Sequence, residues 1–183
     1  MSNTPTLIVI HGLSTTGKTT VGKEIAKRLN VPFLSKDRFE EMMFDHFTVP
    51  NSKKWRENCD RVGYDLLWHV AELILKSGSS CLIETKFHDE DASKILNLKR
   101  KYKLKLVQLF FEADRSILSD RFRKRALSDR HPVHGDIEDL EDRVKRLSKA
   151  VSKPLKLGCK TIKINTSDLS KIDINCIISK INE

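Results

Sequence analysis

Short apolar runs rich in β-branched residues alternate along this chain with longer segments in which apolar side chains recur at helical spacing. This alternation is typical of α/β proteins built on a parallel sheet. Five runs are predicted to be strands, namely TLIVIHG (6–12), VPFLSK (31–36), SSCLIETK (79–86), KLKLVQLFFEA (103–113) and TIKINTS (161–167). We therefore expect about five parallel strands with helices on both faces, in a single domain spanning 1–183.

The segments between the strands carry the helical periodicity. It predicts helices at 18–30, 37–47, 54–76, 115–127, 137–150 and 168–181. Asp37 stands in the first turn of the second helix, where the helix dipole favours negative charge. Asp114 is predicted to cap the fourth, because its carboxylate can accept a free backbone N–H. Pro132 and Gly135 interrupt the pattern between the fourth and fifth helices.

Composition agrees with a globular protein, since 39% of the 183 residues are hydrophobic and 32% are charged. The longest apolar runs are far shorter than the roughly 20 residues that cross a bilayer. The first residues, MSNTPT, lack the basic start and apolar centre of a secretion signal. These features predict a cytoplasmic protein without a membrane partner.

Four cysteines, at 59, 81, 159 and 176, are widely spaced and form no CxxC pair. Such spacing argues against zinc and redox motifs. We expect reduced and mostly buried thiols, as is usual in the cytosol.

The formal net charge is +9, which is a common property of proteins that bind polyanions. However, the excess lies in scattered lysines and in one cluster, RFRKR (121–125), rather than in a long basic stripe interleaved with aromatic residues. A solvated basic surface is therefore favoured over a nucleic-acid groove.

The clearest motif follows the first predicted strand. Gly12, Gly17, Lys18 and Thr19 match the Walker A pattern G-x-x-x-x-G-K-[ST]. Glycines let the backbone N–H groups turn toward phosphate oxygens, the lysine reaches the β- and γ-phosphates, and the threonine hydroxyl is a ligand for Mg²⁺. The residues predicted to bind the nucleotide through this loop are Gly12, Leu13, Ser14, Thr15, Thr16, Gly17, Lys18, Thr19 and Thr20.

Ligands of open parallel sheets bind beyond the carboxyl ends of the strands, so the acidic residues there are candidates for chemistry. Asp37 follows the second strand and is a candidate base for an acceptor hydroxyl; a plain helix N-cap is the competing and compatible interpretation. Glu84 ends the third strand. If that strand lies beside the first, Glu84 lies next to Lys18 and Thr19 and either holds Mg²⁺ or contacts the acceptor.

A helical lid is predicted at about 115–135, because basic residues cluster there before the Pro132 and Gly135 break. Arg121 and Arg125 lie four residues apart on one helical face and are candidates to stabilise charge on a transferred phosphoryl group. A solvated basic face is the competing interpretation.

Acceptor binding is expected from the helical segment at about 37–77. Its aromatic residues either stack on the acceptor or simply pack in the core. Those considered are Phe44, His46, Phe47, Trp55 and Tyr64.

Guanine specificity is not expected, because the segment NTSD (165–168) lacks the lysine of the Asn-Lys-x-Asp guanine motif. A motor ATPase would need further sensor elements, for which the chain has little room. The remaining Walker A class is that of small kinases, which need a base, a metal-orienting carboxylate and mobile cations.

The ordered set GLSTTGKTT, LSKDRFEEMMFD, LIETKF and RFRKRALSDRHPVH resembles the small P-loop kinases of the AAA_33-type predicted-kinase group, relatives of chloramphenicol phosphotransferase, polynucleotide 5′-kinase and zeta-toxin kinases. The resemblance implies a P-loop NTPase three-layer sandwich, ATP with Mg²⁺, Asp37 as base and lid arginines on the phosphates. It also implies that Thr166 to Asp168 lies against the adenine. Polynucleotide kinases carry an arginine three residues beyond the base, where this chain has Glu40.

Together these features predict an ATP-dependent phosphotransferase that moves the γ-phosphoryl group of ATP to a hydroxyl of a small molecule. Its predicted catalytic residues are Lys18, Asp37, Arg121 and Arg125. The alternative is an ATP-dependent nucleic-acid-binding protein or a polynucleotide 5′-kinase. No motif specifies the acceptor or an oligomeric state.

Overall fold

The computed structural model describes residues 4–47, 52–128 and 130–183. Parts of the predicted N-terminus (1–3), acceptor-side segment (48–51) and lid (129) lie outside the described residues. In chain order the elements are β1 (Thr6–Gly12), α1 (Lys18–Leu29), β2 (Phe33–Ser35), α2 (Lys36–His46), α3 (Lys53–Lys76), β3 (Cys81–Glu84), α4 (Asp91–Tyr102), β4 (Lys105–Glu112), α5 (Arg115–Leu127), the 3-10 helix η1 (Pro132–His134), α6 (Leu140–Lys149), β5 (Lys160–Asn165), the 3-10 helix η2 (Leu169–Lys171) and α7 (Ile174–Asn182).

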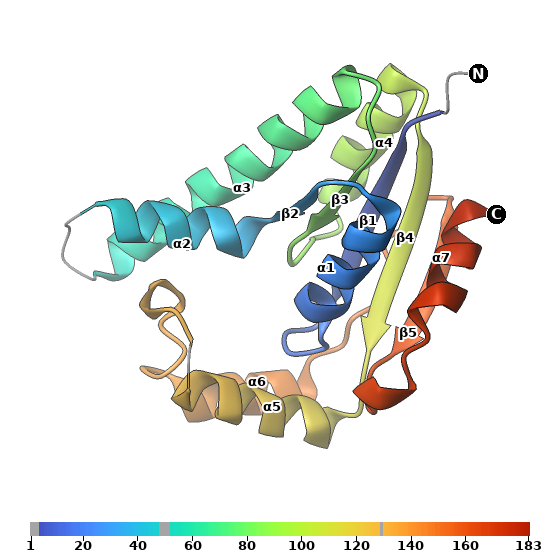
Figure 1. Cartoon of the computed structure of the whole chain (residues 1–183). Helices are drawn as coiled ribbons and strands as arrows, with labels where there is room; N and C mark the ends of the chain where they lie inside the picture. Colours follow the sequence, from blue (N-terminus) through green and yellow to red (C-terminus); the bar gives the residue numbers. More distant parts are fainter. Residues whose placement is uncertain (1–3, 48–51, 129) are drawn as a thin grey trace.

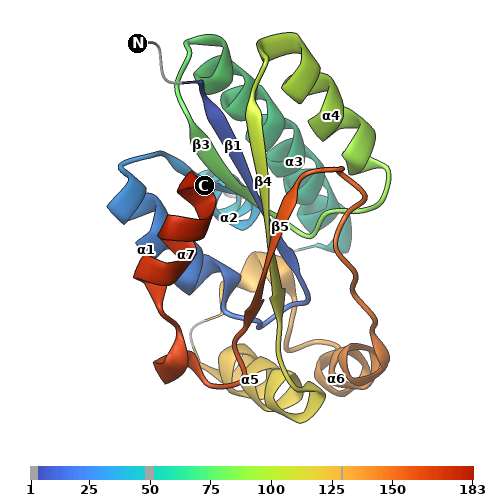
Figure 2. The same cartoon turned by 90° about the vertical axis from the view of Figure 1, so that its right-hand side faces the viewer.

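The five strands form one parallel sheet in the order β2-β3-β1-β4-β5. Helices α1 and α7 cover one face, and α3 and α4 cover the other (Figures 1 and 2). The predicted neighbourhood of the first and third strands is confirmed, because Ile10 of β1 pairs with Glu84 of β3. The α/β class and the three-layer arrangement predicted from the sequence are therefore confirmed.

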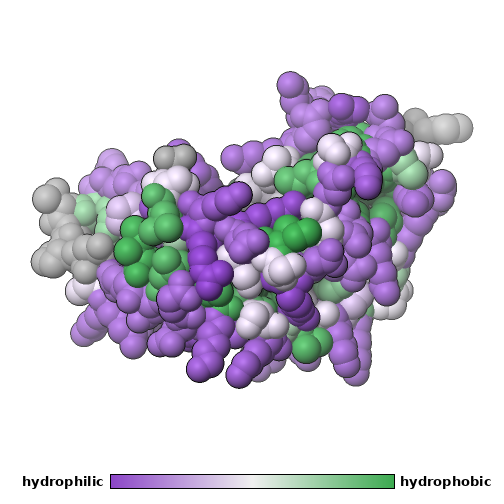
Figure 3. All heavy atoms as spheres, turned by 90° about the horizontal axis from the view of Figure 1, so that it is seen from below, coloured by the Kyte–Doolittle hydropathy of each residue, from purple (hydrophilic) through white to green (hydrophobic). Residues whose placement is uncertain are grey.

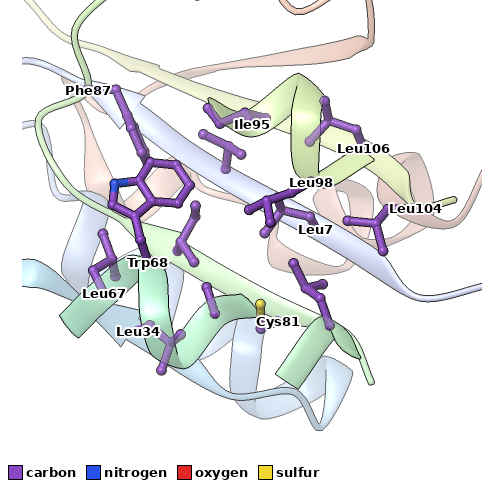
Figure 4. Close-up of a cluster of buried hydrophobic side chains, with 14 of the residues drawn as sticks. Leu7, Leu34, Leu67, Trp68, Cys81, Phe87, Ile95, Leu98, Leu104 and Leu106 are labelled. Atoms are coloured by element: carbon purple, nitrogen blue, oxygen red, sulfur yellow. The ribbon is translucent and has the colours of Figure 1, made fainter. Parts of the chain in front are cut away.

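The central strands β1, β3 and β4 are buried on both faces, as expected of a parallel sheet covered by helices, whereas the edge strand β5 buries only Ile162 and Ile164. On the α3–α4 side, Trp68 and Phe87 stack edge to face with ring centroids 6.0 Å apart, and Leu7 and Ile95 lie beside them (Figure 4). On the other side, α1 and α7 pack on the sheet through apolar residues that include Ile25 and Ile177. Burial of both faces rigidifies the strand ends from which the candidate site is built.

Helix α4 was not predicted. Ile95 and Leu98 are buried, and Ala92, Leu96 and Tyr102 pack against the same core, so apolar residues do recur at helical spacing here and this signal was not used in the prediction from the sequence. The predicted closing helix at 168–181 is divided into η2 and α7. Asp173 causes this division, because its carboxylate accepts the backbone N–H of Cys176 and starts a new helix.

Two predicted caps need correction. Asp114 is the N-cap residue of α5, but its side chain makes no cap hydrogen bond. Instead its backbone N–H donates to the Ser167 hydroxyl at 2.9 Å, which ties the start of α5 to the loop after β5. The N-cap residue of α2 is Ser35, so Asp37 lies inside the first turn with its carboxylate available for other contacts.

All four cysteines are free thiols, as predicted. Cys59 and Cys81 are buried, Cys159 is half-buried and Cys176 is exposed, so burial extends to fewer of them than expected. Within the described part of the chain, no helix has the length and apolar character needed to cross a membrane.

Gly12, at the end of β1, has a backbone conformation and a neighbour that exclude a side chain. Its φ is +147°, and an added Cβ would lie 2.3 Å from the backbone oxygen of Phe111 on the paired strand β4. We expect Gly12→Ala to lower the free energy of unfolding by about 2–4 kcal/mol, because neither backbone segment can move cheaply. Gly78→Ala is the matched control.

Gly78 also has a positive φ, +83°, but nothing lies within 4 Å of an added Cβ. The control therefore contains only the backbone strain, which we expect to cost about 1 kcal/mol. Denaturant unfolding of both variants measures the difference, and equal losses would contradict a steric role for Phe111.

Candidate active site

The phosphate loop, residues 12–19, connects β1 to α1 at the carboxyl edge of the sheet. Thr15 and Gly17 both adopt positive φ values, 61° and 78°, which curls the loop around its own backbone. Thr16 is 1% exposed and its hydroxyl donates to the carbonyl of Leu13 at 2.8 Å. The loop thus has the shape required to turn successive N–H groups toward an anion.

Lys18 is buried in this loop, with its ammonium 2.6 Å from the carbonyl oxygen of Leu13. Burial lowers the pKa of Lys18, and the carboxylates of Glu84 and Asp37 partly oppose that effect. A desolvated ammonium with so few partners gains strongly from a bound anion. This electrostatic situation is that of a phosphate site.

Glu84 lies at the end of β3, as predicted, and is hydrogen-bonded to two hydroxyl groups. Its carboxylate accepts hydrogen bonds from Thr19 at 3.2 Å and from Ser35 at 2.8 Å. Glu84 is only 7% exposed. This set of hard oxygen atoms is the kind that Mg²⁺ prefers.

Asp37 projects from the first turn of α2, and its side chain is 44% exposed. The guanidinium of Arg130, from the lid, lies 3.3 Å from its carboxylate, and the ammonium of Lys36 lies 3.7 Å away. Burial would raise the pKa of Asp37, but the positive charges of His134, Lys36 and Arg130 outweigh it and lower the pKa. The carboxylate is therefore charged at neutral pH.

His134 contributes little to that effect near neutrality, because burial and the nearby Arg130 lower its own pKa. Ligand atoms of Asp37, Glu40 and His134 lie within 4.8 Å of one another, as in many metal sites. However, the Lys36 ammonium lies 2.9 Å from Glu40 and already supplies the positive charge there. We therefore assign this cluster to ion pairing rather than to a metal.

Glu40, at the position where polynucleotide kinases carry arginine, is 4% exposed. Burial raises its pKa, and the contact with Lys36 opposes that effect. Its carboxylate also lies 3.7 Å from the ring of His134. Glu40 thus holds the Lys36 ammonium close to Asp37 by an ion pair.

The two predicted lid arginines have different environments. Arg121 donates to the backbone carbonyls of Thr166 and Ser167 at 2.8 and 3.3 Å, so it contacts the loop after β5. Arg125 lies 3.4 Å from the carboxylate of Asp136 and over the ring of Phe122. Both arginines line the same cavity as Lys18.

Thr166 is fully buried, and its hydroxyl donates to the carbonyls of Thr16 and Glu112 at 2.7 and 3.1 Å. Its side chain therefore supports the phosphate loop from behind. The resemblance implied that Thr166 contacts adenine. The side chain of Thr166 cannot make this contact in the structure, because it has no exposed surface. Among the neighbouring residues, Leu169 of η2 does line the cavity.

A cavity of about 1170 Å³ joins these groups. That volume exceeds the 300–1,000 Å³ of ordinary single-ligand pockets, so the cavity has room for a nucleotide and a second molecule. From the phosphate loop, Ser14, Thr15, Gly17, Lys18, Thr19 and Thr20 line it. From the strand ends and the lid come Asp37, Glu84, Arg121, Arg125 and Arg130.

The segment predicted to be a lid contacts the helices on the opposite side of the cavity. Figure 1 shows the loop that carries η1 rising from α5 and α6 toward α2. Arg56 of α3 makes a bidentate ion pair with Glu138, with distances of 2.8 and 2.6 Å, and His131 contacts Asp45 of α2 at 2.8 Å. These contacts connect the segment predicted to be a lid with α2 and α3.

Only part of the RFRKR cluster belongs to the site. Arg123 pairs with Glu141 at 2.9 Å on the outer surface, and both side chains are well exposed. Viewed from below, the surface of the lid helices is mainly hydrophilic (Figure 3). The interpretation as a solvated basic face applies to this residue, and the interpretation as a lid applies to Arg121 and Arg125.

The aromatic residues of the acceptor-side segment are not among the described residues that line the cavity. Tyr64 packs against Trp68, Trp55 against Phe47, and Phe44 against His131. Of these residues only Tyr64 packs against the buried core, whereas Phe44 and Trp55 are half-buried on the surface and His46 and Phe47 are exposed. The core-packing interpretation therefore holds for Tyr64 alone. Polar groups line that side of the cavity instead, including Lys36, Lys53, Arg56, Glu57, Asp60 and Lys86.

Arg130, which lies within the basic segment RFRKRALSDRHPVH, lines the cavity, but no specific role was predicted for it from the sequence. Sequence reasoning missed Asp136 and Arg143, which also line the cavity. No sequence pattern pointed to these two residues, because their ion pair at 2.7 Å depends on how the loop after η1 folds back.

A family model, AAA_33, described as an AAA domain, matches residues 7–150. Among solved structures, a "putative kinase" from Chloroflexus aurantiacus J-10-fl is 32% identical, with a TM-score of 0.89 and 98% of each chain covered. A sugar kinase from Janibacter sp. HTCC2649 is 15% identical, with a TM-score of 0.55, covering 96% of this chain and 91% of that one.

A gluconokinase from Sinorhizobium meliloti 1021 is 17% identical, with a TM-score of 0.50, covering 98% of this chain and 90% of that one. At such identities these last two likenesses show the fold alone. No curated protein matches the chain.

Proposed function

This chain belongs to the AAA_33 family, and from that premise we propose that it is an ATP-dependent phosphotransferase acting on a hydroxyl of a small polar molecule. One observation carries the proposal: the charged carboxylate of Asp37 and the buried ammonium of Lys18 line one cavity, and a lid arginine contacts that carboxylate. A switch protein needs the phosphate clamp but has no need for a carboxylate opposite it. The 32% identical "putative kinase" supports the same class of reaction.

In the proposed reaction, Lys18 and the loop N–H groups bind the β- and γ-phosphates of ATP. Asp37 accepts a hydrogen bond from the acceptor hydroxyl and orients its oxygen toward the γ-phosphorus. A new O–P bond forms, the bond to the bridging oxygen breaks, ADP leaves, and the hydroxyl proton passes to Asp37. Arg121 and Arg125 stabilise charge on the transferred group.

Thr19 and Glu84 are the residues that would hold Mg²⁺, because both line the cavity and a hydroxyl and a carboxylate oxygen lie 3.2 Å apart there. Ser35 supports the other oxygen of the Glu84 carboxylate at 2.8 Å. When bound there, the ion neutralises negative charge on the phosphates. The observed hydrogen bonds to Glu84 fix its orientation toward Thr19.

The acceptor side is charged and hydrogen-bonding rather than apolar. Of its lining residues, only Val133 offers an aliphatic side chain, whereas Asp60, Glu57 and Lys53 offer charges. Such a wall is suited to a compound with several polar groups, as in sugars, amino sugars and nucleosides. An acceptor without polar groups would make no hydrogen bonds with these side chains and would gain little from them.

The test is a screen for acceptor-dependent release of ADP, with sugars, amino sugars, nucleosides, apolar antibiotics and a 5′-hydroxyl oligonucleotide. We expect a polar small molecule to raise ADP release well above the ATP-only rate and to gain the mass of one phosphoryl group. Phosphate appearing on the oligonucleotide alone would instead support the polynucleotide kinase. Nucleic-acid binding that falls steeply with salt, without transfer, would support the binding protein.

A further inference from the structure

Asp136 lies just before α6, in the loop that follows η1, and its side chain is only 3% exposed. A carboxylate this deeply buried is costly unless positive charges surround it. Three guanidinium groups do so here: those of Arg125, Arg130 and Arg143 lie 3.4, 3.0 and 2.7 Å from its oxygens.

The arginines reach Asp136 from three separate parts of the lid. Arg125 belongs to α5, Arg130 to the connection after it, and Arg143 to α6. Without a common anion they would repel one another, and such repulsion by Arg130 already helps burial to lower the pKa of Arg125. Asp136 is therefore the group that allows three like charges to share one side of the cavity.

The cluster keeps positive charge and hydrogen-bond donors for a ligand. Even with Asp37, which contacts Arg130 at 3.3 Å, two carboxylates face three guanidinium groups, so one positive charge remains. In addition, the Nε atoms of Arg125 and Arg143 are buried and have no hydrogen-bond partner among the described residues. Since both side chains line the cavity, their donors and net charge suit an anion bound there.

The cluster is also connected to the proposed base. Arg130 contacts Asp136 through Nε at 3.0 Å and Asp37 through a terminal nitrogen at 3.3 Å. A shift of Asp136 would therefore move Arg130 relative to Asp37. No other described carboxylate of the lid has an ion-pair partner that also contacts Asp37.

We propose that Asp136 is a positioning residue, which orders Arg125, Arg130 and Arg143 into one cationic cluster facing the γ-phosphate and, through Arg130, fixes the geometry at Asp37. The proposal rests on the proposed function for its catalytic consequence. Its consequence for binding concerns only the terminal phosphate: the cluster should favour a nucleoside triphosphate over a diphosphate.

The test compares Asp136→Asn with Glu141→Gln, a matched control that removes a lid carboxylate from an exposed ion pair with Arg123. Calorimetry measures the affinities for ADP and for a non-hydrolysable ATP analogue. We expect Asp136→Asn to lower the ratio of analogue to ADP affinity about tenfold, and the turnover number roughly 10- to 100-fold, through misplaced charge. Glu141→Gln should change neither quantity more than about twofold.

Asp136→Glu keeps the charge and should restore part of the affinity ratio, which a purely structural role would not require. If Asp136→Asn fails to fold, Arg143→Gln takes its place and should lower the same ratio, because it removes one donor while leaving the carboxylate paired. An unchanged ratio in a folded variant, or equal losses in Glu141→Gln, would overturn the proposal.

The two proposals can fail separately. If the wild type transfers phosphate and the affinity ratio is unaffected, the role of Asp136 is wrong and the kinase assignment stands. If the affinity ratio falls in Asp136→Asn but no acceptor is ever phosphorylated, the role of Asp136 stands and the kinase assignment is wrong. Absence of nucleotide binding by the wild type would contradict both.

Discussion

Replacing Asp37 by asparagine is expected to lower the turnover number by about 10²- to 10⁴-fold, the range typical of a lost general base. ATP affinity should change little, since the carboxylate does not belong to the phosphate loop. The substitution keeps the shape of the side chain but removes its charge and its capacity to accept a proton. Steady-state transfer to the acceptor, with ATP affinity measured separately, checks both halves of the expectation.

The electrostatics of Asp37 predict the pH dependence as well. Its pKa is lowered, so the charged and active form persists as pH falls below the usual carboxyl range and is lost only in stronger acid. If Asp37 limits the activity, the turnover number should therefore not change between about pH 5 and 7, and it should fall only at lower pH. A fall near pH 6 would point to another group.

Asp45→Asn is the matched control for Asp37→Asn. It removes a carboxylate from the same helix, 63% exposed and paired with the lid through His131. Turnover within about twofold of the wild type is expected, because exposed ion pairs contribute little. A similar loss in both variants would mean that lid closure, and not a base, explains the effect, and normal turnover of Asp37→Asn would remove Asp37 from the mechanism.

The sheet could be predicted because β1, β3 and β4 are mainly apolar runs and β5 alternates apolar with polar residues, both of which are strand patterns. The order of strands around β1 follows from the fold class that the Walker A motif indicates. Helix α4 was predictable on the same grounds as the other helices, since Ala92, Ile95 and Leu96 recur at helical spacing and pack on the core, but it was left out of the prediction from the sequence. The division of the last helix was not predicted either. It depends on one residue, Asp173, whose carboxylate caps a new helix although the apolar periodicity continues past it.

In the candidate site, the donor side could be predicted, because Lys18 and Thr19 lie in a contiguous motif whose geometry is local. Asp37 and Glu84 were accessible as strand-end residues. The role of Asp136 was not accessible, because its environment depends on the return of the chain from η1 to α6. Charge clusters formed by distant segments leave no periodic signal.

Replacing Lys18 by alanine is expected to weaken binding of ATP by at least about tenfold and to lower turnover by roughly 10²–10³, the cost of removing one preorganised cation from a phosphoryl-transfer site. The physical reason is the state of the ligand-free protein. Lys18 is 8% exposed, and burial lowers its pKa, so its charge is poorly solvated until a phosphate binds. The interaction between this ammonium and the phosphate therefore contributes strongly to the free energy of ATP binding.

The comparison with Lys23→Ala isolates that gain, since Lys23 is an exposed lysine on the same helix. The control removes the same formal charge from the protein and should leave ATP affinity within about twofold, because exposed charges are screened. Titration calorimetry with ATP and with ADP measures both variants. Equal affinities of Lys18→Ala and wild type would show that the loop N–H groups alone hold the phosphates, and the clamp assigned to Lys18 would be wrong.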